Sequence, residues 1–292
     1  MLLRIIKKTP SINFLGNRNL FFISSSLLAG LSIIFLIIKG LNFGIDFKGG
    51  LLIEIAFNKN VEIVEVRKKL NEFVEGDFSI QSLDNSNNTY LIKLETFSSK
   101  KNNNQELILN IKKSLNSDYE NVDYRRLEYV GPTVSSELIK AGILSILIAV
   151  SAMLVYIWFR FELPFAVGAV LALIHDIVLT IGMFSITSLE FNLATVAAIL
   201  LIIGYSMNDT VVVYDRIREN LKKFRKTNLI SLLNKSVNET LSRTINTTAT
   251  TILALLALYI FGGNIIKDFS LAMIWGILIG TYSSILIATP VL

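Results

Sequence analysis

The chain has 292 residues, of which 52% are hydrophobic and 17% are charged, and its mean hydropathy is +0.56. This balance is too apolar for a soluble protein and indicates an integral membrane protein. The sequence contains no cysteine, which excludes disulfides, thiolate metal sites and thiol nucleophiles.

Six apolar runs are long enough to cross a bilayer core about 30 Å thick, which takes roughly 20 helical residues. They cover residues 20–38, 138–159, 164–184, 193–214, 244–261 and 269–291. The first run follows four basic residues and is not followed by a small-residue cleavage site. We therefore expect it to be an uncleaved span and not a signal peptide.

Basic residues flank the predicted spans and orient them. Residues 1–19 carry four Lys/Arg and no acid, and residues 215–243 carry eight Lys/Arg against three acids. The positive-inside rule puts both segments in the cytoplasm. Both termini are then cytoplasmic, and residues 39–135 lie on the opposite, trans side of the membrane. This topology accounts for the net charge of +5, so no nucleic-acid partner is expected.

The segment between the first two spans alternates strand-like and helix-like patterns. The order is strand, helix, strand, strand, helix, strand, which predicts a ferredoxin-like α+β domain. The predicted elements cover residues 51–57, 61–74, 78–83, 90–94, 105–115 and 122–130, with a hairpin turn at Asp84–Asn88.

The predicted fold is thus a polytopic α-helical membrane protein with six transmembrane helices and one ferredoxin-like domain. Its parts are a cytoplasmic segment (1–19), a first span (20–38), the periplasmic domain (39–135) and a five-helix membrane domain (136–292) with a basic cytoplasmic loop (215–243). One span, a large domain and five further spans make half of a twelve-helix transporter plan, so a similar partner half is expected.

Ionisable residues inside spans are costly and are functional candidates by default. Asp209 lies in the cytoplasmic half of the fourth span, about 9 Å before its end at Asp215. Arg243 begins the fifth span at a similar depth, so the two side chains can form an ion pair. Because Asp can gain a proton when the pair separates while Arg keeps its own, the pair could act as a proton switch. The alternative is that Arg243 only extends to the cytoplasmic surface.

Polar residues around this pair extend the hypothesis. The run Thr244–Thr251 is rich in hydroxyls and suits a hydrated crevice, or it bonds back to its own helix. Asn208 and the adjacent His175 and Asp176 of the third span are possible members of a proton path. Since neighbouring helical residues point about 100° apart, His175 and Asp176 are not expected to share a face, and structural polar packing is the favoured interpretation.

Four motifs carry a resemblance to a known family. They are Asp46-Phe47-Lys48-Gly49-Gly50, the segment 130–138 (VGPTVSSEL), Ile174-His175-Asp176 and, most specifically, the segment 204–220 (GYSMNDTVVVYDRIREN). The sequence resembles the SecD/SecF family of the RND superfamily over essentially its whole length. The family usually has glycine where Ser135 stands, which affects local turn geometry.

The resemblance implies a subunit that couples proton-motive force to late steps of preprotein export and is not an enzyme. It implies partnership with SecD, with the SecYEG channel and a YajC-like subunit, with unfolded preprotein and with membrane lipid. The family's proton-relay residues match Asp209 and Arg243. No cofactor or metal is expected, and protons are the coupling ion, with Na⁺ as an alternative.

Rival functions make different demands on the same residues. An intramembrane aspartyl protease would use Asp176 and Asp209, but the Gly-x-Gly-Asp pattern is missing and an arginine near Asp209 would oppose a shared proton. Half of an RND-type exporter of lipids or small molecules would keep the fold and change the cargo. A purely structural stabiliser would tolerate the loss of the Asp209 charge.

Overall fold

The computed structural model describes residues 10–59, 61–72, 78–83, 88–95, 104–119 and 121–292. The chain divides into two compact units, one made of Met1–Asn42 and Gly142–Leu292 and the other of Phe43–Ala141. The short strand β1 (Asn42–Phe43) lies where the chain passes from the first unit to the second.

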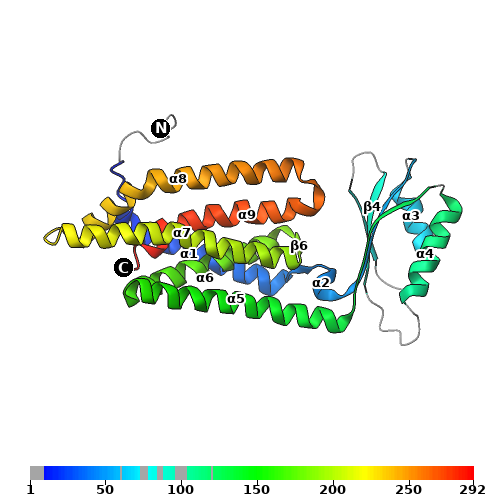
Figure 1. Ribbon diagram of the computed structural model, residues 1–292, viewed down its shortest axis with the longest axis horizontal. Coiled ribbons are helices and arrows are strands. Elements are labelled where there is room, and N and C mark those ends of the chain that lie inside the picture. Colours follow the sequence, from blue (N-terminus) through cyan, green and yellow to red (C-terminus); the bar gives the residue numbers. More distant parts are fainter. Residues whose placement is uncertain (1–9, 60, 73–77, 84–87, 96–103, 120) are drawn as a thin grey trace. The chain divides into compact units, whose positions relative to one another are not determined.

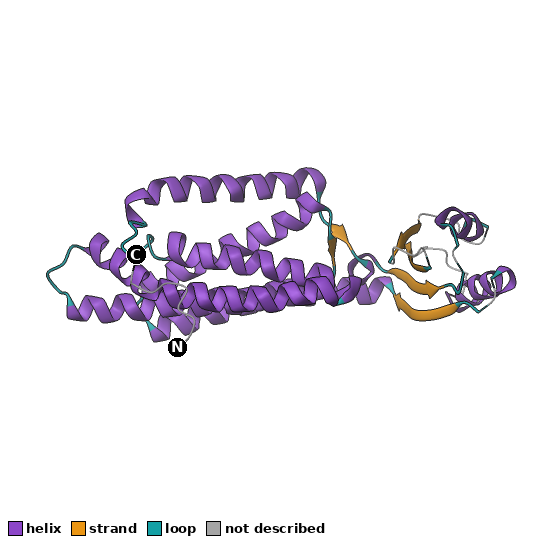
Figure 2. Ribbon diagram, turned by 90° about the horizontal axis from the view of Figure 1, so that it is seen from above, coloured by secondary structure: helices purple, strands orange, loops and turns teal. Residues whose placement is uncertain are grey.

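The first unit is a bundle of membrane-length helices. Six helices are long and apolar enough to cross a membrane, which confirms the six predicted spans. They are α1 (Arg18–Lys39), α5 (Pro132–Arg160), α6 (Leu163–Thr187), α7 (Leu193–Lys223), α8 (Leu229–Phe261) and α9 (Gly263–Ser283). A short turn, η1 (Leu15–Asn17), precedes α1, and strand β6 (Glu190–Phe191) lies between α6 and α7. The helices lie side by side along one direction (Figures 1 and 2).

Three of the helices form the centre of the bundle. More than half of the apolar stretch of α6, α7 and α9 is buried, whereas α1, α5 and α8 expose most of theirs. After Ser283, α9 continues as a π-helical turn, η2 (Ser284–Ala288). Ala288 ends this turn, and its carbonyl accepts the Tyr214 hydroxyl at 3.0 Å. The central helices therefore meet through polar contacts as well as apolar packing.

The basic segment 215–243 is a helical hairpin and not the loop that the charge pattern predicted. Helix α7 continues to Lys223 and α8 starts at Leu229, so only residues 224–228 lie outside the two helices. Arg216 Nε donates to Glu239 Oε2 at 2.6 Å, and Asn220 Nδ2 donates to the same oxygen at 2.8 Å. These contacts join the two helices beyond the apolar stretch. Charged residues lower the hydropathy of a segment below that of a membrane span, but they do not prevent it from forming a helix.

The second unit contains a four-stranded sheet and two covering helices. Its elements are α2 (Ile45–Lys48), β2 (Gly50–Ala56), α3 (Ile63–Leu70), β3 (Phe78–Ser82), β4 (Thr89–Glu95), α4 (Asn104–Asp118) and β5 (Asp123–Val130). The sheet order is β3-β4-β2-β5, and every neighbouring pair is antiparallel. This is the arrangement of the ferredoxin-like β-α-β-β-α-β unit. Residues 132–135, which the sequence pattern assigned to this domain, form the first turn of α5.

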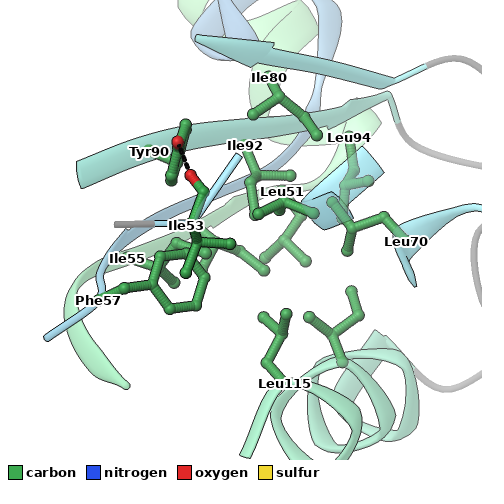
Figure 3. Packing of buried hydrophobic residues seen from close by; sticks show 13 residues of the cluster. Leu51, Ile53, Ile55, Phe57, Leu70, Ile80, Tyr90, Ile92, Leu94 and Leu115 are labelled. Atoms are coloured by element: carbon green, nitrogen blue, oxygen red, sulfur yellow. Dashed lines mark hydrogen bonds between the residues drawn. The ribbon is translucent and has the colours of Figure 1, made fainter. Parts of the chain in front are cut away.

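The core of this unit lies between one sheet face and the two helices (Figure 3). Alternate residues of β2, among them Ile53 and Ile55, are fully buried against Leu70 of α3 and Leu115 of α4. Alternation places these side chains on one face of the sheet, as the strand pattern predicted. Full burial of each such side chain contributes about 1.5–3 kcal/mol.

Two adjacent glycines begin the sheet. Gly49 has φ 78° and Gly50 has φ 145°, which side chains with a Cβ rarely adopt. The pair turns the chain from α2 directly into β2, so the glycines act as a tight turn. Residues 84–87 of the predicted hairpin turn and residues 73–74 of the predicted first helix lie outside the described residues.

Candidate functional site

Asp209 is buried in the centre of the bundle. Its helix, α7, starts at an Asn192 cap whose side chain accepts the backbone N–H of Thr195 at 3.1 Å. The Asp209 side chain is 2% exposed, and its Oδ2 atom has no hydrogen-bond partner among the described residues. A buried carboxyl oxygen without a partner is costly as an anion, so this site is suited to binding a proton or a cation.

Hydroxyl groups of α8 and α9 lie beside this carboxyl group. Thr281 of α9 lies against Asp209, and its hydroxyl is 2.9 Å from that of Thr248 on α8. Other threonines of the predicted crevice instead bond back to their own helix: Thr247 to the Arg243 carbonyl and Thr251 to the Thr247 carbonyl. The hydroxyl-rich run is thus mainly satisfied within α8, and Thr248 is the member that faces α9.

Arg243 lies on α8 with its side chain exposed, and Asp209 experiences its positive charge through space. Among the described side chains the two form no ion pair, so the contact predicted from sequence is not made in this conformation. Asn208, next to Asp209, is exposed on α7, whereas the Asp209 carboxyl group is buried.

His175 and Asp176 form a second buried polar cluster. His175 Nδ1 is 3.1 Å from Asp176 Oδ1, so the expectation that the two side chains diverge is wrong. The helical wheel gives only the direction of each Cα–Cβ bond, and the side-chain rotamers bring the two groups together. Asp176 Oδ2 also accepts hydrogen bonds from Ser206 of α7 at 2.7 Å and Ser283 of α9 at 2.8 Å. One carboxylate therefore joins the three central helices.

The close approach of α7 and α9 depends on two glycines that the sequence reasoning did not single out. A Cβ atom at Gly276 would collide with Ile202, and one at Gly280 would lie 2.9 Å from Ser206 Cβ. Gly276 and Gly280 form a G-x-x-x-G pattern, which lets membrane helices pack closely. The pattern was visible in the sequence and predicts that α9 is an interface helix. It also explains how serines from two helices reach the same carboxylate.

No cluster of three or more His, Cys, Asp or Glu side chains that could hold a metal ion occurs among the described residues. Among the described residues, the buried polar groups of the bundle include two carboxyl groups and one imidazole, beside several hydroxyls. The carboxyl groups and the imidazole can bind and release protons, and the hydroxyls can donate and accept hydrogen bonds.

Comparison with known proteins gives the chain its family. Residues 110–292 match the family described as protein export membrane protein SecD/SecF, C-terminal, and residues 34–61 match the SecD/SecF GG motif. The chain is 42% identical to the protein translocase subunit SecF of Rickettsia bellii over 99% of its own length and 95% of that protein. It is 43% identical to SecF of Rickettsia felis over 99% of its length and 94% of that protein.

Solved structures agree with this result. The crystal structure of SecDF, a translocon-associated membrane protein from Thermus thermophilus, matches 97% of this chain with a TM-score of 0.84 and 37% identity. A crystal structure of SecDF in a super-membrane-facing form matches with a TM-score of 0.71 and 36% identity. The chain covers 38% of each SecDF chain. The six-helix bundle, the double glycine at the start of the sheet and these matches show that the chain belongs to the SecF family of Sec protein translocase subunits.

Proposed function

We propose that this translocase subunit couples the proton-motive force to late steps of preprotein translocation, with Asp209 and Arg243 as the proton relay. The observation that carries the proposal is the buried Asp209 carboxyl group, whose Oδ2 atom lacks a partner among the described residues. A structural carboxylate would be expected to have its oxygens bonded, as those of Asp176 are.

Two conformations would give Asp209 two charge states. With Arg243 apart, as here, burial favours the neutral carboxylic acid, which would be loaded with a proton from the trans side. When Arg243 approaches, its fixed charge favours the carboxylate, and the proton leaves to the cytoplasm. Across a potential of 100 mV one elementary charge carries about 2.3 kcal/mol. That is comparable with the energy needed to separate a partly hydrated ion pair.

The proposed setting is a bacterial inner membrane with both termini in the cytoplasm. The basic hairpin of α7 and α8 supports this orientation, because its Lys and Arg residues belong on the cytoplasmic side. The ferredoxin-like domain would then be periplasmic, where it would contact unfolded preprotein as it emerges.

The proposed partners are SecD and the SecYEG channel. The description of SecDF as translocon-associated and the 38% coverage of its chain support a larger assembly in which this chain is one part. A YajC-like subunit and membrane lipid remain part of the proposal on the family resemblance alone. The alternative of a lipid or small-molecule exporter has no support from the comparisons, whose curated relatives are protein translocase subunits.

Translocation into inverted membrane vesicles, with and without an uncoupler, tests the relay. Asp209→Asn imitates the neutral acid at nearly equal volume and should abolish the uncoupler-sensitive part of translocation while leaving the ATP-driven early step intact. Arg243→Lys keeps the charge but loses the planar fork, so it should impair this part less than Arg243→Gln. Full retention of the uncoupler-sensitive part in Asp209→Asn would refute the assignment. The same translocation assay identifies the coupling ion: collapse of the proton gradient or of a Na⁺ gradient should remove the gradient-dependent part only for the ion that is used.

A further inference from the structure

The second buried cluster has the properties of a proton-binding site in its own right. Asp176 is 1% exposed and His175 is 9% exposed, and both lie in the apolar middle of α6. The proposed relay through Asp209 does not use them. Their contacts reach α7 through Ser206 and α9 through Ser283.

The hydroxyl of Ser283 has two acceptors within reach. It is 2.8 Å from Asp176 Oδ2 and 3.2 Å from the carbonyl oxygen of Gly280. When Asp176 is ionised, Ser283 donates to it. When Asp176 carries a proton, Asp176 can donate to Ser283, which then donates to Gly280. Because a hydroxyl can donate and accept at once, the cluster can gain a proton with its heavy atoms in place.

His175 provides the second proton-accepting atom. Its Nδ1 faces Asp176 Oδ1 at 3.1 Å, while its Nε2 is buried with no partner among the described residues. An ionised Asp176 requires a hydrogen on Nδ1, which leaves Nε2 as a free base. A proton on Nε2 would turn the cluster into an imidazolium–carboxylate pair with no net charge. The ring lies over that of Tyr282, with centroids 6.1 Å apart, and an aromatic face favours a cation.

Among the described residues, few other titratable groups face the cluster from the helices packed against α6. Tyr282 of α9 shares a hydrogen bond of 2.7 Å with Ser25 of α1, and Tyr214 of α7 donates to Ala288. Asp209 is three residues after Ser206 on the same side of α7. The charged residues of α1, Arg18 and Lys39, lie at its two ends. The charge of the cluster is therefore set mainly by its own proton.

We propose that Asp176 and His175 form a second proton-binding site, separate from Asp209, that holds one proton where α6, α7 and α9 meet. The binding of a proton stands on the geometry of the cluster alone. A part of this site in energy coupling would rest on the proposed function. The connection is that Asp209 lies on α7 and Thr281 on α9, the same two helices that carry Ser206 and Ser283.

Nitrogen NMR of the histidine ring tests the site directly, because His175 is the single histidine of the chain. The full chain, labelled with ¹⁵N-histidine and purified in lipid nanodiscs with a histidine-free tag, should show hydrogen on Nδ1 and none on Nε2 at neutral pH. Where partner subunits are needed for stability, a His175→Gln complex identifies the signals by difference. Acidification should add a proton at Nε2.

Asp176→Asn should abolish the fixed Nδ1–H form and shift the ring to the Nε2–H tautomer or to a mixture of the two tautomers, because no carboxylate then faces Nδ1. Asp209→Asn is the matched control and should leave the ring signals of His175 unchanged. An Nε2–H ring in the unmodified chain, or an Asp176→Asn chain with the same ring tautomer, would overturn the proposal. Neither result depends on translocation, so the proposal for this site and the proposal for the Asp209 relay can be refuted separately.

Discussion

Replacing Gly280 with alanine should separate α9 from α7. The new Cβ would lie 2.9 Å from Ser206 Cβ and 3.2 Å from Ser206 Oγ. Ordinary contact begins at 3.4 Å, so the helices must move apart by roughly 0.5 Å, the difference between 3.4 and 2.9 Å. Overpacking of this kind costs about 1–3 kcal/mol.

The displacement also acts on the polar cluster. Ser206 and Ser283 donate to Asp176 Oδ2 at 2.7 and 2.8 Å, and they come from the two helices that Gly280→Ala pushes apart. A shift of about 0.5 Å takes at least one of these bonds past the 3.0 Å limit of a good O–H···O bond. We therefore expect lower stability together with a changed His175 ring signal.

Heat unfolding of the purified protein in lipid nanodiscs, monitored by pulse proteolysis, measures the change in stability. The matched control is Gly30→Ala on α1, where a Cβ meets nothing within 4 Å and where alanine should be neutral or slightly stabilising. A Gly280→Ala protein as stable as the Gly30→Ala protein, with unchanged His175 signals, would refute the close-packing argument.

Three further predictions concern the ferredoxin-like unit and the topology. Tyr90→Phe removes the hydroxyl that donates to the Val61 carbonyl in the core and should lower that unit's stability by about 1–3 kcal/mol, measured by hydrogen exchange in the full chain. Burial raises the pKa of Tyr124 from 10.0 to about 12, so the folded state favours the neutral phenol. The free energy of unfolding that this preference adds is present below pH 10 and is lost between pH 10 and 12. Tyr124→Phe should flatten that part of the stability curve, and an unchanged curve would contradict this. Because the chain lacks cysteine, Ser79→Cys on β3 and Lys226→Cys in the basic hairpin each give one label site, and an impermeant maleimide added to spheroplasts should modify Ser79→Cys alone. Modification of Lys226→Cys alone would reverse the topology.

The architecture could be predicted from the sequence because it depends on periodicity. Runs of apolar residues gave all six spans, and alternation gave the strand and helix order of the soluble unit. The ends of α7 and α8 could not be predicted, because hydropathy stops at the membrane while the helices continue. The continued segments are joined by Arg216 and Glu239, which lie 23 residues apart and form no local pattern in the sequence.

The candidate site was predicted by residue type but not by geometry. The rarity of charge inside a span singled out Asp209 and Asp176, and both are buried. The partners of these carboxyl groups depend on how helices pack, so the sequence suggested an Asp209–Arg243 pair that this conformation lacks and missed the serines that bind Asp176. The G-x-x-x-G pattern of α9 was the local signal that could have indicated that packing.

Proton movement during translocation tests the central claim most directly. Inverted vesicles with an acidified lumen and a trapped pH-sensitive dye would report protons that leave as a preprotein is translocated. We predict that a preprotein accelerates proton loss in vesicles with the unmodified chain and with the exposed control Asp118→Asn, and that it has no such effect with Asp209→Asn. Preprotein-dependent proton loss of equal size with Asp209→Asn would contradict the account.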